Sequence, residues 1–97
     1  MTTERQLLPG RRANYSIPLE FEGHRYRATA GRFANGDLAE IFLDVGKAGT
    51  PLRSNAETAA ILVSLALQHG VDPETIRHSV NGPIAVALDH FMKVQAL

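Results

Sequence analysis

The sequence predicts an α+β domain, in which a three-stranded antiparallel meander is followed by a buried helix and two shorter helices. Two observations predict this class. Between residues 14 and 45 apolar and polar side chains alternate with a period of two, interrupted by two glycine-containing turns, as in half-buried hairpin strands. Beyond residue 55 the apolar spacing becomes helical. With 97 residues, the chain has the size of one domain.

The first strand is predicted over about residues 14–22. Its apolar side chains alternate with polar ones, which places them on one face: Tyr15, Ile17, Leu19 and Phe21. Pro18 has no backbone N–H to donate to a neighbouring strand, so it indicates a strand at the edge of the sheet.

The dipeptide Gly23-His24 predicts a two-residue type II′ turn, because glycine stands at the first central position. This turn leads into a second strand over about residues 25–33. The predicted register places Phe21 opposite Tyr26, Leu19 opposite Ala28 and Ile17 opposite Ala30.

The dipeptide Asn35-Gly36 predicts a type I′ turn, because both residues tolerate a positive φ, and it leads into a third strand over about residues 38–45. The predicted register pairs Ala30 with Ile41, Ala28 with Leu43 and Tyr26 with Val45. Both turns therefore direct apolar residues to one face of the sheet, and this agreement is what a well-specified sheet requires.

The opposite face, called here the outer face, is predicted to hold a row of charged residues: Glu20, Arg27 and Asp44. The same register places three large apolar residues there: Phe33, Leu38 and Phe42. Such a cluster predicts a docking surface, unless the carboxy-terminal helix or the amino-terminal arm covers it.

Three helices follow. Ser54 and Glu57 have the spacing of a capping box and predict a buried helix over about residues 55–69. Asp72-Pro73 predicts the start of a helix over about 73–80, and Pro83 opens another over about 83–93. Residues 1–12 are expected to form a flexible arm, and residues 13–97 a single α+β domain.

Composition limits the function classes. Ten basic and ten acidic residues cancel, which argues against nonspecific binding to nucleic acid. The absence of cysteine excludes disulfides and thiolate metal sites in this chain. No hydrophobic segment is long enough to cross a bilayer and no signal peptide is recognisable, so a cytoplasmic location without membrane association is expected.

The loop between the third strand and the first helix is the main candidate for ligand chemistry. Exposed amides and the ammonium of Lys47 could hold a phosphate, with help from Arg12 or Arg32. The candidate residues of this anion or nucleotide site are Gly46, Lys47, Gly49, Thr50, Arg12 and Arg32. The Walker pattern is not met, because Ala48 stands where serine or threonine is needed, and a simple strand-to-helix turn is the alternative interpretation.

The residues alone indicate no catalytic and no metal-binding site. None of the four histidines is paired at i, i+4, and Asp89-His90 lacks the nucleophile elbow that would indicate hydrolytic chemistry.

Several blocks of the chain resemble the TSCPD-type domain, which occurs near the carboxy terminus of adenosylcobalamin-dependent ribonucleotide reductases and in short stand-alone proteins. The resemblance covers roughly residues 9 to 92. It is carried above all by Ala39-Glu40-Ile41-Phe42 through Gly49 and by Ala66-Leu67-Gln68-His69-Gly70, and is extended by Ile76, Gly82-Pro83-Ile84 and Ala87-Leu88-Asp89.

The resemblance implies an accessory module of deoxyribonucleotide metabolism that is not catalytic alone. Its partner would be a ribonucleotide reductase large subunit or a second copy in a homodimer, and adenosylcobalamin would belong to the reductase. The family's cysteine-bearing motif is missing, so this chain cannot pass reducing equivalents through thiols. The alternative function is a small regulatory domain that binds a nucleotide or phosphate at residues 46–50.

Overall fold

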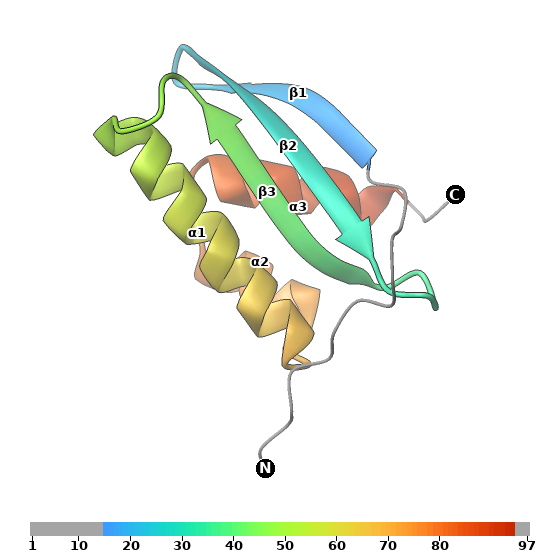
Figure 1. The fold of residues 1–97 in the computed structure, drawn as a ribbon. Helices are drawn as coiled ribbons and strands as arrows, with labels where there is room; N and C mark the ends of the chain where they lie inside the picture. The colour runs from blue at the N-terminus through green and yellow to red at the C-terminus, as the bar shows by residue number, and fades with distance from the viewer. Residues whose placement is uncertain (1–14, 95–97) are drawn as a thin grey trace.

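The structure is a computed structural model that describes residues 15–94 (Figure 1). Three strands form one antiparallel sheet in the order β1-β2-β3 and three helices follow, which confirms the predicted α+β class. Their bounds are β1 Tyr15–Phe21, β2 His24–Arg32, β3 Leu38–Val45, α1 Pro51–Gln68, α2 Pro73–Ser79 and α3 Pro83–Lys93. The expected arm, residues 1–12, lies outside the described residues.

The register between β2 and β3 is confirmed. Tyr26 pairs with Val45, Ala28 with Leu43 and Ala30 with Ile41. All six side chains are buried, because this face of the sheet packs against the helices.

The predicted register between β1 and β2 is wrong by two residues. Phe21 pairs with His24 rather than with Tyr26. The turn consists of Glu22 and Gly23, which both have a positive φ of 50° and 82°. These values fit the type I′ turn that matches the twist of a hairpin. A shift of two residues preserves the side-chain alternation, so the apolar face stayed correct.

A β-bulge in β3 changes what the outer face presents. Gly31 pairs with Glu40 and Arg32 with Leu38, so Ala39 is an extra residue. Beyond such a bulge the side chains exchange faces. Leu38 is accordingly turned inward and is 6% exposed.

The predicted outer cluster is therefore wrong for two of its three residues. Phe33, in the loop after β2, is also only 6% exposed, whereas Phe42 is 49% exposed. The loop is not the predicted two-residue turn. The Gly36 N–H donates to the Phe33 carbonyl at 2.9 Å, and of Asn35 and Gly36 only the glycine has a positive φ, 95°.

Helix α1 starts earlier than predicted. Thr50 is its N-cap, and the Thr50 Oγ1 atom accepts a hydrogen bond from the Arg53 N–H at 3.3 Å. Pro51 occupies the first helical position, where its fixed φ suits a helix and its missing N–H is not needed. Ser54 consequently lies inside the first turn, and the predicted capping box is not formed. The predicted end at His69-Gly70 is confirmed, with Gly70 at a φ of 89°.

This start of α1 gives a direct stability test. We expect Thr50→Ala to lower the free energy of unfolding by about 1 kcal/mol, because the helix loses its side-chain cap. Ser54→Ala removes a hydroxyl that has no hydrogen-bond partner among residues 15–94, so it is the matched control and should change the free energy of unfolding by less than about 0.5 kcal/mol. Urea denaturation of both variants would contradict this assignment if Ser54→Ala were the more damaging change.

The core lies between the sheet and the helices. Figure 1 shows α1 running alongside β3 and α3 crossing behind the strands. Three large side chains are fully enclosed in this layer: Phe91 and Leu88 from α3, and Ile41 from β3. Helix α2 contributes Ile76 and joins α3 through an ion pair between Arg77 and Asp89, described below.

Both edge strands of the sheet have features that limit pairing with a further strand. Along β3, the Ser64 Oγ atom of α1 accepts from the Ile41 N–H at 2.9 Å and donates to the Ile41 carbonyl at 3.0 Å. Gln68 donates to the Ala39 carbonyl at 3.2 Å. The Ile41 N–H and carbonyl thus point away from β2, so the backbone groups of its partner Ala30 point toward Tyr15 in β1. Backbone direction alternates along a strand, so the nitrogen of Pro18, three residues after Tyr15, points away from β2 toward the outer edge of β1. The predicted edge position of Pro18 is thereby confirmed.

Candidate functional site

The most exposed large apolar residues of the described chain lie on the outer side of α1. Ile61 is 58% exposed and Leu62 is 61% exposed. With Thr58 and the half-buried Leu65 they follow the i, i+3, i+4, i+7 spacing of one helix face. We call Thr58, Ile61, Leu62 and Leu65 the α1 stripe.

No charged residue interrupts this surface. From Thr58 to Gln68 the helix contains only apolar or neutral polar residues. A surface helix ordinarily carries charged groups opposite its buried face, so the α1 stripe is unusual and is typical of an interaction surface. Because this helix is apolar nearly all round, the sequence predicts a buried helix, whereas the structure leaves this side exposed.

The predicted anion loop is largely occupied by its own hydrogen bonds. Thr50 donates through Oγ1 to the Lys47 carbonyl at 2.9 Å while the same oxygen caps α1. Gly46 and Gly49 have φ values of 61° and 88°, which explains the glycines by backbone geometry. The Lys47 ammonium has no partner within residues 15–94. Thr50 therefore serves the strand-to-helix turn, the alternative interpretation of this loop.

Sequence reasoning missed Arg53 at this loop. Its guanidinium donates to the Gly46 carbonyl at 3.2 Å, to Asp44 at 2.9 Å and to Glu57 at 3.0 Å. The i, i+4 spacing of Arg53 and Glu57 was the available signal. Because two carboxylates already neutralise this guanidinium, it adds little attraction for a phosphate.

Arg32 does not join the loop. Tyr26 opposes Val45 beside the loop, and Arg32 lies six residues further along β2, roughly 20 Å away. Its guanidinium donates to three carbonyls instead: Gly36 at 2.9 Å, Phe91 at 2.8 Å and Val94 at 2.7 Å. The prediction that Arg32 helps to bind an anion at residues 46–50 is therefore wrong, and Arg12 lies outside the described residues.

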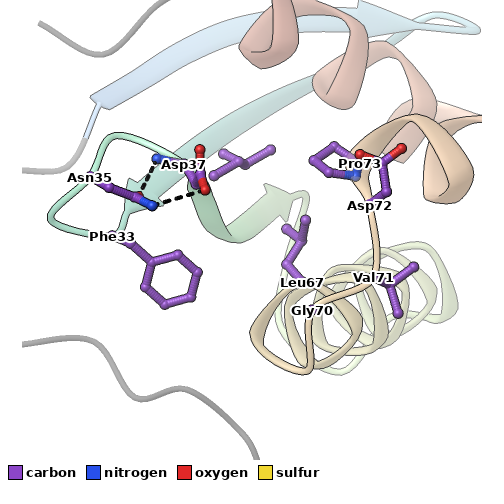
Figure 2. Close-up of a pocket in the computed structure, with 9 residues that line it drawn as sticks. Phe33, Asn35, Asp37, Leu67, Gly70, Val71, Asp72 and Pro73 are labelled. Carbon is purple, nitrogen blue, oxygen red and sulfur yellow. Dashed lines mark hydrogen bonds between the residues drawn. The ribbon is translucent and has the colours of Figure 1, made fainter. Parts of the chain in front are cut away.

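Phe33 and Leu38 line a pocket of about 340 Å³ at one end of the sheet (Figure 2). Leu67 and Val71 form its apolar wall, and the carboxylates of Asp37 and Asp72 stand on opposite sides. Asn35 donates to the Asp37 carboxylate at 3.0 Å and accepts from the Asp37 N–H at 2.9 Å. The pocket is thus acidic, the opposite of what an anion site requires.

A second pocket, of about 290 Å³, lies between the first halves of α1 and α3 and beneath the β1–β2 turn. We call it the α1–α3 pocket. Tyr26, Leu43 and Ile84 form its buried floor, while the amides of Asn55 and Asn81 stand at its exposed rim. No local sequence pattern indicates this pocket, because its walls come from four separate segments.

Arg77, Asp89 and His90 make contacts that stabilise the packing of the helices and the sheet. Arg77 donates to Asp89 at 2.7 Å, and this hydrogen bond lowers the pKa of the Asp89 carboxyl and raises the pKa of Arg77. His90 stacks on Tyr15, and its Nε2 atom is buried without a hydrogen-bond partner in the part of the chain that the structure describes. Among residues 15–94 no group of three potential metal ligands is present, and no helix is long and apolar enough to cross a membrane.

These features define the class of protein as a small two-layer α+β domain with an exposed apolar helix face. The chain belongs to the TSCPD domain family, whose pattern matches residues 11–88. Vitamin B12-dependent ribonucleotide reductase from Agrobacterium fabrum is 38% identical over 74 residues, which are 76% of this chain and 6% of that protein.

The enzyme of the same name from Bradyrhizobium diazoefficiens is 43% identical over 68 residues, which are 70% of this chain and 5% of that protein. The chain thus corresponds to a small part of each of these relatives. No solved structure matches the chain significantly.

Proposed function

We propose that this chain is an accessory interaction module for vitamin B12-dependent ribonucleotide reductases, and that it docks onto the reductase polypeptide through the α1 stripe. The exposure of Ile61 and Leu62, at 58% and 61%, carries the proposal. Membership of the TSCPD family supports the choice of partner, because the named relatives contain the matching segment within a much longer polypeptide. Catalysis and adenosylcobalamin binding belong to the reductase in this proposal.

The size of the α1 stripe favours a reductase over a second copy of this chain. A stable interface buries about 800 Å² on each partner, and one face of a few helical turns offers much less. Two such stripes in contact would give only a weak homodimer. A groove that surrounds the helix can bury more of each side chain, as in complexes where an amphipathic helix lies in an apolar groove.

The test is a binding measurement by biolayer interferometry with the full-length Agrobacterium reductase. We expect the wild-type chain to bind. Leu62→Asp should raise the dissociation constant at least tenfold, because a carboxylate would be moved from water into an apolar groove. Val86→Asp is the matched control. Val86 is an exposed aliphatic residue on α3, 38% exposed, and lies outside the α1 stripe.

Two outcomes would contradict the proposal. Absence of binding by the wild-type chain is the first, and equal weakening by Val86→Asp is the second. Sedimentation of the chain alone tests the alternative partner, a second copy of this chain. If the wild-type chain forms a dimer, Leu62→Asp is a monomer and neither binds the reductase, the α1 stripe is a homodimer interface.

A further inference from the structure

The α1–α3 pocket combines an apolar floor with polar side chains that make no hydrogen bond to the described residues. Tyr26 is 5% exposed, and within residues 15–94 no hydrogen bond engages its hydroxyl. The same holds for the side chains of Asn55 and Asn81 at the rim. The Tyr26 hydroxyl is not one of the polar atoms that are sealed from solvent without a partner, so it stays accessible and can hydrogen-bond to a molecule that enters the pocket.

The lining also restricts the charge of that molecule. No lysine or arginine from residues 15–94 contributes to this pocket, and its titratable lining residues are Glu22 and His24. A phosphate would find no lysine or arginine there and would be repelled by Glu22. A neutral group suits the pocket best.

The shape of the pocket and its hydrogen-bonding groups further restrict the chemical class of the ligand. The floor contains the aromatic ring of Tyr26 and the aliphatic side chains of Leu43 and Ile84, against which a flat ring can pack. Each asparagine amide offers both donors and an acceptor. A planar heteroaromatic ring with donors and acceptors along its edge is complementary to both features, and a volume of about 290 Å³ suits a small ligand.

We propose that the α1–α3 pocket binds the nucleobase of a nucleoside or nucleotide, with any phosphate left outside in solvent. The relatives are named for ribonucleotide reduction, which fits a ligand of this chemistry. This site is separate from the α1 stripe and from residues 46–50, so it does not depend on docking to the reductase.

The experiment is an NMR titration of the ¹⁵N-labelled chain with adenosine, guanosine, cytidine and uridine. For a ligand of this size, we expect at least one nucleoside to bind with a dissociation constant on the order of 0.1 to 1 mM. The amide signals that move should be those of Leu43, Ala56, Ala59 and Ile84, which line the pocket.

Two variants on α1 give a matched comparison. Ala59→Leu places three extra carbons at the pocket and should weaken binding at least tenfold. Ala66→Leu makes the same change two turns further along the same helix face, outside the pocket, and should leave the affinity unchanged. Tyr26→Phe removes only the hydroxyl and should weaken binding several-fold.

The proposal is overturned if none of the four nucleosides moves these signals at millimolar concentration, or if Ala59→Leu binds as well as the wild-type chain. Binding of nucleoside diphosphates without binding of nucleosides would overturn it as well, because the anion would then be the recognised group. Leu62→Asp should retain nucleoside binding, so failure of this proposal is distinguishable from failure of the docking proposal.

Discussion

Ser64→Ala should lower the free energy of unfolding by about 3 kcal/mol. The Ser64 hydroxyl lies between the N–H and the carbonyl of Ile41, and it satisfies both groups at distances of 2.9 and 3.0 Å. Ile41 is fully buried and Ser64 is 9% exposed, so little water can replace the hydroxyl. Each buried polar group left without a partner costs about 1 to 3 kcal/mol.

Urea denaturation monitored by circular dichroism would measure this effect. Ser54→Ala is the matched control, because it makes the same substitution on the exposed side of the same helix and should change stability by less than about 0.5 kcal/mol. Hydrogen exchange at the Ile41 amide should accelerate in Ser64→Ala. A loss of less than about 1 kcal/mol would mean that the hydroxyl does not stabilise this edge of the sheet.

Arg32→Met should lower the free energy of unfolding by about 2 kcal/mol. The guanidinium of Arg32 joins two segments that are about 60 residues apart in the sequence, because it donates to the Gly36 carbonyl and to the Phe91 and Val94 carbonyls at the end of α3. A cation at a helix carboxyl end also interacts favourably with the helix dipole. Methionine keeps most of the aliphatic stem and removes these hydrogen bonds, and a hydrogen bond that involves a charged group contributes about 1.5 to 3 kcal/mol. Because Arg32 is only partly buried, water can replace part of these hydrogen bonds, and the expected loss is smaller than the sum of the three contributions.

Arg27→Met provides the control, because Arg27 is exposed on the outer face and has no hydrogen-bond partner within residues 15–94. We expect its effect to be below about 0.5 kcal/mol. If Arg32 instead served an anion site, phosphate would stabilise the wild-type chain and not Arg32→Met, and the two proteins would have similar stability without phosphate.

The sequence was sufficient for the fold class because each prediction depended on local patterns. Alternation of side chains identified the strands, and the register predicted for β2 and β3 holds from Tyr26–Val45 to Gly31–Glu40, although the loop between the strands is not the predicted two-residue turn. The β1–β2 turn was ambiguous. Gly23 can be the first or the second central residue of a hairpin turn, and only the positive φ of Glu22 distinguishes the two.

The surface was harder to predict than the fold, because it depends on contacts between distant segments. A single bulge residue, Ala39, reverses the direction of Leu38, and no residue type signals that insertion. The partners of Arg32 lie on α3, so its role could not follow from its own neighbours. Phe42 was placed correctly because it lies between the bulge and the end of β3, where the predicted register holds.

The treatment of the two sheet edges determines how this domain can associate with other chains. An open strand edge is a template for adding a further strand, which is a common route to both peptide capture and aggregation. Here the α1 helix occupies the β3 edge through Ser64 and Gln68, and Pro18 removes a donor from the middle of the β1 edge. Growth of the sheet across chains is therefore disfavoured at the β3 edge and weakened at the β1 edge, which favours association through side-chain packing against the helices.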